Sequence, residues 1–154
     1  MKKVIILRGV SGSGKSTQVY NIQDQYKMGC RVCSADDYFI QDGEYKFNIS
    51  KLSQAHVACF GKFLNGMRFS NELIIVDNTF TRIWEVENYI KAAHLSGYEV
   101  EIRELQITTI EQLKICVDRN RHEVSFEVMA NQAKRFETMV GYRANVKVDV
   151  IPFN

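Results

Sequence analysis

The sequence predicts an α/β fold in which parallel strands alternate with helices. Two apolar runs, residues 4–7 and 73–76, are each four residues long, and a glycine-rich turn follows the first of them. Continuous apolar runs of this kind are typical of strands that are covered on both faces. Stretches with apolar residues at helical spacing separate the predicted strands, and strands joined by helices form parallel sheets with right-handed crossovers. We therefore expect one parallel sheet with helices on both faces.

Each of the five predicted strands has its own apolar pattern. Residues 4–7 and 73–76 are the two continuous runs, and residues 31–34 form a short strand after the first helix. Residues 98–103 alternate apolar and charged side chains, which indicates a strand with one wetter face. Residues 146–150 alternate valine with charged residues and are the last predicted strand.

The helices are predicted from apolar side chains at helical spacing. Gly29 and Gly97 follow two of these stretches and can adopt the left-handed conformation that ends a helix. Thr109 and Gln112 match a capping box, and Ser125 is a candidate cap for the last helix. The expected helices cover residues 14–28, 50–69, 82–95, 109–117 and 126–140.

The length and composition are those of a single globular domain, residues 1–154. The chain is 45% hydrophobic and 25% charged, and its net charge of +2 permits contact with phosphates without requiring a long nucleic-acid footprint. No apolar stretch reaches the ~18–20 residues that span a bilayer. Arg8 interrupts the first apolar run, so this run is a strand and not a secretory signal. We expect a cytoplasmic protein without a membrane segment.

The four cysteines are not expected to bind metal or to form disulfides. Cys30 and Cys33 have a C-x-x-C spacing, but the chain offers neither a second such pair nor a histidine pair to close a zinc site. Beside a predicted strand, cysteine is more often a small buried hydrophobic residue. Disulfides are rare in the reducing cytoplasm that we expect for this chain.

A phosphate-binding loop follows the first predicted strand. Residues 9–16 read Gly-Val-Ser-Gly-Ser-Gly-Lys-Ser, a full match to G-x-x-x-x-G-K-[ST]. Glycines let backbone N–H groups point at a phosphate, and the next helix presents its positive dipole end to the same anion. Lys15 can reach the β- and γ-phosphates of ATP, and the Ser16 hydroxyl can contact Mg²⁺. The predicted donor-binding residues are Gly9, Ser11, Gly12, Ser13, Gly14, Lys15, Ser16 and Thr17.

Acidic residues follow two other predicted strands. Asp77 comes directly after residues 73–76, where a carboxylate can hold Mg²⁺ directly or through water; the alternative is a cap for the next helix. Asp36 and Asp37 come after residues 31–34, where a carboxylate can accept the proton of an attacking hydroxyl. The alternative for this pair is a solvated turn. In a parallel sheet the carboxyl ends of the strands share one edge, so ligands are expected there.

The charged residues between the last two predicted helices are candidates for a closing lid. A guanidinium from Arg119 or Arg121 could neutralise charge on a transferred phosphoryl group, although an exposed charge run is the commoner role. His122 lies in the same segment, and a lone histidine in a polar loop is usually solvated.

Four further side chains could contribute to an acceptor site. His56 could line it, although a half-buried structural histidine is the plainer expectation. Trp84, Tyr38 and Phe39 could stack on a base, but core packing is expected for each.

Taken together, these residues resemble one family of P-loop kinases, which contains the 5′-hydroxyl polynucleotide kinase domain and the NEDD4-binding-protein-2-like proteins. The resemblance runs from about residue 4 to residue 140, and the string Asp36-Asp37-Tyr38 is its most specific element after the phosphate loop. Its motifs are Arg8-Gly9, Gly12–Thr17, Ser34-x-Asp36-Asp37-Tyr38-Phe39, Val76-Asp77-Asn78-Thr79, Trp84-Glu85 and Arg119-Asn120-x-His122.

This resemblance implies a three-layer P-loop fold with the strand order 2-3-1-4-5 and a helical lid. It implies that Asp36 is the general base, that Arg119 contacts the donor phosphates, and that ATP and Mg²⁺ are used. Lys15, Asp36 and Arg119 are then the catalytic residues, and Ser16 and Asp77 hold the metal. Phe39 departs from the family pattern, because the phage polynucleotide kinase has an arginine at this place that helps to hold the acceptor strand.

The acceptor stays open at this point. We expect transfer of the γ-phosphate to a hydroxyl of a nucleic-acid end, a nucleoside or a modified base. The alternatives are a small-molecule kinase, with an antibiotic or a nucleotide sugar as acceptor, and a non-catalytic adaptor that binds ATP.

Overall fold

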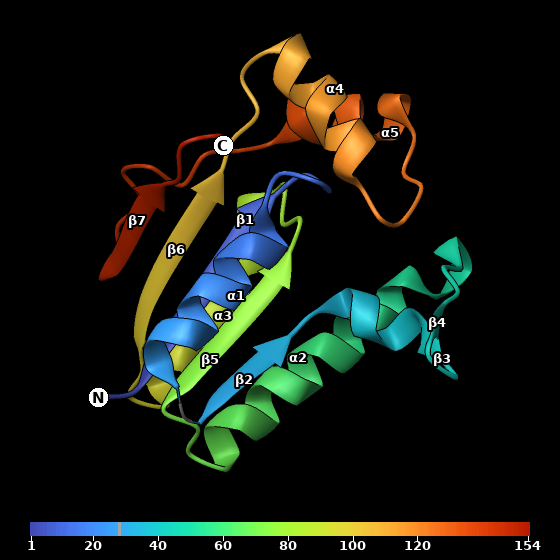
Figure 1. Cartoon of the computed structure of the whole chain (residues 1–154). Coiled ribbons are helices and arrows are strands. Elements are labelled where there is room, and N and C mark those ends of the chain that lie inside the picture. The colour runs from blue at the N-terminus through green and yellow to red at the C-terminus, as the bar shows by residue number, and fades with distance from the viewer. Residues whose placement is uncertain (28) are drawn as a thin grey trace.

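The computed structural model describes residues 1–27 and 29–154 and contains a five-stranded parallel sheet (Figure 1). Its order is β2-β5-β1-β6-β7, so the expected order 2-3-1-4-5 is confirmed. The two continuous apolar runs lie in neighbouring strands, and β1 is the middle strand. The strands are β1 (Lys3–Gly9), β2 (Cys30–Cys33), β5 (Leu73–Asn78), β6 (Glu99–Leu105) and β7 (Val146–Val150).

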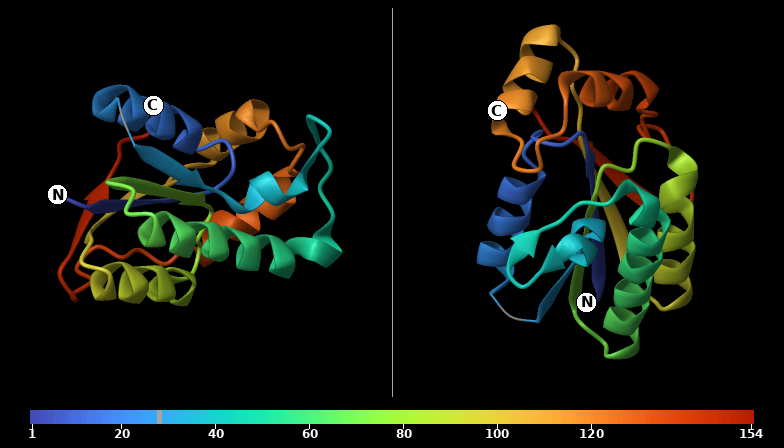
Figure 2. Two further views of the ribbon diagram at one scale, coloured as in Figure 1. Left: turned by 90° about the horizontal axis from the view of Figure 1, so that it is seen from below. Right: turned by 90° about the vertical axis from the view of Figure 1, so that its right-hand side faces the viewer.

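Helices cover both faces of this sheet and its carboxyl edge. Figure 2 shows α1 on one face and α2 and α3 on the other, whereas α4 and α5 lie beyond the strand ends. No helix within the described residues is both long and apolar enough to cross a membrane. The helices are α1 (Lys15–Tyr26), α2 (Leu52–Arg68), α3 (Ile83–Leu95), α4 (Ile110–Arg119) and α5 (Phe126–Arg135).

The core divides according to the alternation of side chains along the strands. Ile5 and Ile75 point to one face, where they pack with Ile22 of α1. Val4 and Ile74 belong to the larger cluster on the other face, together with side chains of α2 and α3. Both faces of β1 and β5 are buried, which is why these strands have no polar residue before their carboxyl ends.

The cysteines are divided between the same two faces. Cys33 is buried in the larger cluster, and Cys30 packs half-buried on the α1 side, so the two thiols do not share a site. Cys59 and Cys116 are buried, and all four thiols are free. The prediction that the cysteines are small buried side chains is therefore confirmed for three of them.

Several predicted boundaries were wrong. The first helix ends at Tyr26, and Met28, which we had included in it, lies outside the described residues. A 3-10 turn at Ile49–Lys51 precedes α2. The last helix ends at Arg135 and not at residue 140, because Phe136 adopts an extended conformation (φ −64°, ψ 121°).

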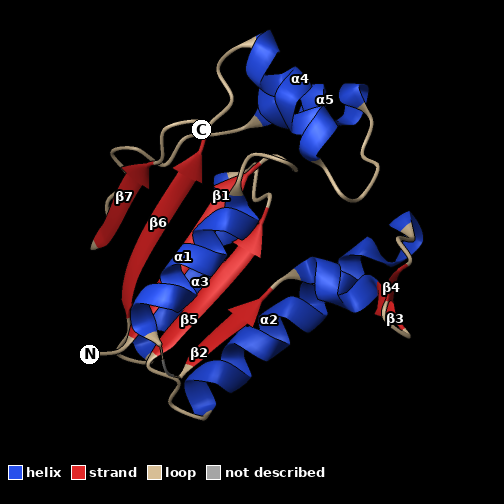
Figure 3. Ribbon diagram, in the orientation of Figure 1, coloured by secondary structure: helices blue, strands red, loops and turns tan. Residues whose placement is uncertain are grey.

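The prediction also missed a two-stranded hairpin, β3 (Ile40–Gln41) and β4 (Glu44–Tyr45) (Figure 3). Its turn is Asp42-Gly43, and both residues have positive φ angles, 51° and 79°. An Asp-Gly pair is a strong hairpin signal, so the sequence did contain this information. The strands are only two residues long, which is too short to show alternation.

Candidate active site

The phosphate loop has the geometry of an anion cradle. Gly12 and Gly14 have φ angles of 76° and 108°, a conformation that glycine adopts most readily. Gly14 is also the N-cap of α1 and provides no side chain to cap it, so the first N–H groups of the helix are left for another acceptor. The Ser13 hydroxyl is buried and has no hydrogen-bond partner among the described residues. The loop therefore fits a bound phosphate.

Close packing around the loop leaves no room for side chains at two of its glycines. A Cβ atom at Gly9 would lie 2.6 Å from Ser13 Oγ and 2.9 Å from the carbonyl oxygen of Leu105. A Cβ atom at Gly12 would overlap the carbonyl oxygen of Cys116, which belongs to α4. Helix α4 thus packs directly on the loop.

Lys15 joins the loop to the acidic residues of the site. Its Nζ donates hydrogen bonds to the carbonyl oxygens of Gly9 (2.8 Å) and Val10 (3.1 Å). Burial lowers the pKa of Lys15, and the negative charges of Asp77 and Asp36 oppose this shift. The lysine is therefore within electrostatic reach of carboxylates from two different strand ends.

Asp77 is the carboxylate nearest to the base of the loop. It lies at the end of β5, in register with Leu7 of β1. Burial raises the pKa of its carboxyl group, whereas the positive charge of Lys15 acts in the opposite direction. Ser16 and Thr17 are exposed at the start of α1.

The site has few protein ligands for a metal ion. Within the described part of the chain, no group of three or more His, Cys, Asp or Glu side chains could hold one. Mg²⁺ keeps several waters and is usually bound by one or two carboxylates together with substrate phosphates. Ser16 and Asp77 fit that mode of binding.

The Asp36 carboxylate lies on a short 3-10 helix, η1 (Ala35–Phe39), that follows β2. Asn78, the last residue of β5, holds this helix, because its Oδ1 accepts a hydrogen bond from the buried Ala35 N–H (2.9 Å). Ser34 caps the helix and accepts from Asp36 N (3.3 Å). Asp36 thus projects at the carboxyl edge of the sheet, as the sequence predicted.

Two aromatic side chains surround the Asp36 carboxylate. Tyr45 of the hairpin donates to Asp36 Oδ1 (3.2 Å), and its pKa is raised by burial and by the charge of Asp36. His122 Nε2 lies 3.5 Å from Asp36 Oδ2. The rings of Tyr45 and His122 are in contact, with centroids 3.9 Å apart. His122, which sequence reasoning left as a solvated side chain, is therefore part of the site.

Asn120 shapes the loop that carries His122. Its Oδ1 accepts hydrogen bonds from the backbone N–H groups of His122 and Val124, both at 3.0 Å. Its Nδ2 donates to the carbonyl oxygen of Val124 (2.9 Å). The loop between α4 and α5 thus reaches the opposite side of the site, and this segment (residues 109–135) corresponds to the predicted lid.

The remaining candidates lie around this centre or away from it. Asp37 pairs with Lys62 of α2 (3.3 Å), and Arg121 is exposed. Arg119 Nη2 donates to the carbonyl oxygen of Asn154 (2.7 Å), and its guanidinium lies 5.2 Å from the Phe153 ring centroid. Arg119 thus contacts the last residues of the chain, and its role toward the donor stays a prediction.

The plainer expectations for the aromatic residues and His56 were partly wrong. Phe39 is buried, with 2% of its surface exposed, and His56 is half-buried, as expected. Trp84, in contrast, is 70% exposed, because the first turn of α3 extends past the core. Tyr38 is also exposed and donates to Gln54 Oε1 (2.9 Å).

Sequence reasoning missed the buried pair that supports the loop from below. Arg8 Nη1 and Glu104 Oε1 are 2.6 Å apart, and both side chains are fully buried. Arg8 also donates to the carbonyl oxygens of Phe80 (2.9 Å) and Glu137 (2.8 Å). The start of the phosphate loop is thereby joined to the chain that follows the lid. An arginine and a glutamate at the ends of predicted buried strands were the available signal.

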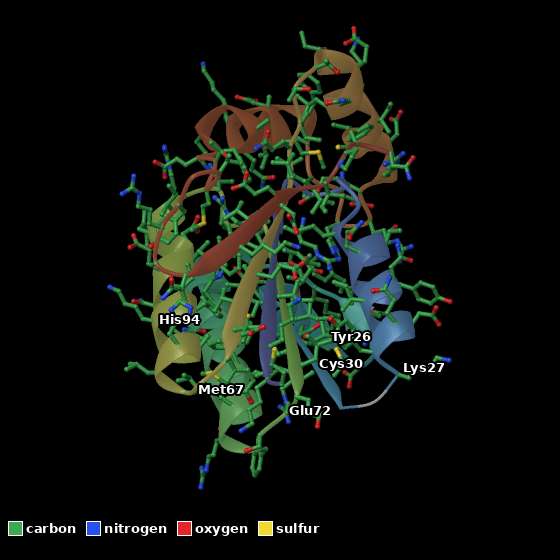
Figure 4. All side chains as sticks on the ribbon, turned by 90° about the vertical axis from the view of Figure 1, so that its left-hand side faces the viewer. Tyr26, Lys27, Cys30, Met67, Glu72 and His94 are labelled. Carbon is green, nitrogen blue, oxygen red and sulfur yellow. The ribbon has the colours of Figure 1, made fainter. Side chains whose placement is uncertain are left out.

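The site residues gather at one edge of the molecule. Figure 4 shows Cys30, Met67 and Glu72 at the other end, far from α4 and α5. Cys30 begins β2 and Glu72 precedes β5, so this opposite edge is formed by the amino ends of the strands. The carboxyl ends of the strands carry the phosphate loop, Asp77 and η1.

The fold and the loop define a protein of the P-loop kinase class. The chain belongs to the AAA domain family, because the family model AAA_33, described as an AAA domain, matches residues 4–139. This result confirms the resemblance seen in the sequence.

The comparisons with individual proteins agree with this assignment. The chain is 30% identical over 137 residues to human NEDD4-binding protein 2; this covers 89% of the chain but only 8% of that protein. A chain of the Pnkp1/Rnl/Hen1 RNA repair complex has a similar fold (TM-score 0.71, 14% identity, 94% of this chain and 47% of that chain). So does a gluconokinase from Sinorhizobium meliloti 1021 (TM-score 0.60, 17% identity, 96% of this chain and 82% of that chain).

Proposed function

We propose that residues 1–154 form a single kinase domain that transfers the γ-phosphate of ATP to a hydroxyl group of a nucleic-acid end, a nucleoside or a modified base. The main support is the position of the Asp36 carboxylate, whose charge acts on both Lys15 and Asp77. A carboxylate beside the phosphate loop can receive a proton at the place where phosphoryl transfer occurs.

In this proposal the chain's own residues divide the work between donor and acceptor. The loop N–H groups and Lys15 hold the β- and γ-phosphates, and Ser16 and Asp77 hold Mg²⁺, which neutralises phosphate charge when bound. Asp36 accepts the proton of the acceptor hydroxyl. The acceptor oxygen then forms a bond to the γ-phosphorus, and the bond between that phosphorus and the β,γ-bridging oxygen breaks, which leaves ADP. Arg119 would have to leave Asn154 to reach the donor.

The acceptor and the location follow less directly from the structure. The similar folds include a chain of an RNA repair complex and a sugar kinase, and each supports a hydroxyl acceptor. Four free thiols are in keeping with a reducing compartment, so a cytoplasmic location is part of the proposal.

The replacement Asp36→Asn tests the proposal. It keeps the size of the side chain and removes the proton acceptor, so turnover should fall by about 10²–10⁴-fold while ATP affinity stays unchanged. Asp42→Asn is the matched control, because Asp42 is an exposed acid in the hairpin turn and should be replaceable.

The assay uses γ-labelled ATP with a 5′-hydroxyl oligonucleotide, a set of nucleosides and a set of sugars. An equal loss of turnover and ATP affinity in Asp36→Asn would assign this residue a structural role. If ATP stabilises the wild-type fold but no acceptor yields a product, the chain is a nucleotide-binding adaptor and the proposed reaction is wrong.

A further inference from the structure

We propose that an open basic hollow between α3 and α5 binds the backbone phosphates of a nucleic-acid strand whose terminal hydroxyl reaches Asp36. This inference rests on the proposed function and selects a polynucleotide as its acceptor. The hollow has a volume of about 400 Å³, and it is lined by Arg82, Asn131, Lys134 and Arg135.

The charge of this hollow fits an anion. Three of its four lining residues are cationic and none is acidic. Among the described residues, the side chains of Arg82 and Lys134 form no hydrogen bond or ion pair, and Arg135 donates only to Thr81 Oγ1 (3.0 Å). Like charges that converge on one hollow repel each other, and a strand of phosphates would remove that repulsion while releasing its counterions.

The acids that lie closest along the chain are already engaged by the start of α3. Glu85 accepts a hydrogen bond from the backbone N–H of Arg82 (2.9 Å), and Glu137 accepts from that of Ile83 (3.1 Å). They satisfy N–H groups that a helix N-terminus leaves without partners. These carboxylates therefore serve the helix end and leave the three cationic side chains unpaired with them.

The hollow lies at the same edge of the sheet as the site. Arg82 follows Asn78 by four residues, and Asn78 holds the turn that carries Asp36. The chain after α5 is tied to the same segment, because Glu137 N–H donates to the carbonyl oxygen of Thr81 (2.8 Å). In Figure 2 the end of α5 lies beside the start of α3. A strand can thus extend from Asp36 along the edge to these cations.

The surroundings of Asp36 offer little to the phosphates of such a strand. Asp37 and Asp77 add negative charge there, Phe39 is buried, and Lys62 is already paired with Asp37. The phosphates of an acceptor must be neutralised further along, where the hollow supplies the cations. Trp84, two residues after Arg82, offers an exposed ring on which a base can stack.

The test measures binding of a fluorescein-labelled single-stranded 12-nucleotide DNA with a 5′-hydroxyl, by anisotropy and without ATP. The double variant Arg82→Gln/Lys134→Gln should raise the Kd at least tenfold and reduce the salt dependence of log Kd by about one unit. The control Lys27→Gln/Lys91→Gln removes two exposed lysines elsewhere and should leave the Kd unchanged; Figure 4 shows Lys27 at the far end from α5.

Circular dichroism melting verifies that each variant is folded. If the double variant unfolds, Lys134→Glu alone takes its place, because this exposed residue forms no hydrogen bond within the described chain. Equal affinities of the wild type and the variant, or no binding by the wild type, would overturn the inference.

The same measurement separates this inference from the proposed function. Asp36→Asn should bind the 12-nucleotide strand as the wild type does. Binding by the wild type without any phosphorylated product would refute the kinase reaction and keep the surface. Phosphorylation of nucleosides without strand binding would refute the surface and keep the kinase.

Discussion

The donor half and the acceptor half of the site are built from different materials. The donor half consists of the phosphate loop and Asp77, and it is made largely of backbone groups packed against β6 and α4. The acceptor half consists of η1, the β3–β4 hairpin and the lid loop around His122, and it is made of side chains. The side chains of Asp36 and His122 are 54% and 34% exposed, whereas Ser13 in the loop is 5% exposed.

This difference follows from what each half must recognise. A triphosphate always presents the same oxygens, so fixed N–H groups of the backbone can bind it, and close packing keeps them in place. An acceptor hydroxyl is attached to molecules of many shapes, so its recognition falls to exposed side chains that can change without disturbing the core. The acceptor half is therefore where substrate specificity is decided.

The largest effect is expected from Gly12→Ala in the donor half. The new methyl group would overlap the Cys116 carbonyl, and φ would have to stay positive, so the loop must distort. We expect ATP affinity to fall by more than about 100-fold, measured as loss of the thermal shift that ATP produces.

Gly61→Ala is the control for this change. Gly61 lies within α2, and a Cβ atom there would meet nothing within 4 Å. Alanine is favoured over glycine in a helix by about 1 kcal/mol, so this variant should be at least as stable as the wild type. Normal ATP binding by Gly12→Ala would show that the loop is not the rigid half.

Asn78→Ala should separate the two halves. It leaves the buried Ala35 N–H without a partner, which costs about 1–3 kcal/mol of unfolding free energy, and it releases the turn that carries Asp36. We expect turnover to fall about tenfold or more while ATP affinity is retained, in kinetic and binding assays performed in parallel. A loss of ATP affinity equal to the loss of turnover would mean that the halves are not independent.

The smallest effect is a difference in thiol protection. Burial raises the pKa of Cys33, just before η1, to about 12, and it also raises the pKa of Cys116 beneath the loop. Both should remain protonated at pH 8 and react with a thiol reagent about tenfold or more slowly than the half-buried Cys30.

Addition of Mg–ATP should then slow the labelling of Cys116 and leave that of Cys33 nearly unchanged, as followed by mass spectrometry of the labelled peptides. The reason is that α4 packs on the loop, so a bound nucleotide holds the Cys116 region closed. Equal protection of both thiols would mean that the nucleotide tightens the whole site, and the comparison would then have to be revised.

The local pattern of the chain was sufficient for the sheet and the phosphate loop. Strands β1 and β5 are buried on both faces, so their apolar runs need no partner to be recognised, and the loop is specified by glycines at fixed spacing. The ends of α1 and α5 were misjudged because helix boundaries depend on contacts as well as on propensity. The β3–β4 hairpin was missed because its strands are too short to alternate.

Within the site, the sequence alone determined that Lys15, Asp36 and Asp77 share one edge, because parallel strands place their carboxyl ends together. Only the tertiary structure decided that Tyr45 and His122 enclose Asp36, that Arg119 contacts Asn154, and that Trp84 is exposed. It also decided that cations from α3 and α5 meet in one hollow. These contacts join side chains that lie far apart in the sequence, and no local pattern specifies the packing that brings them together.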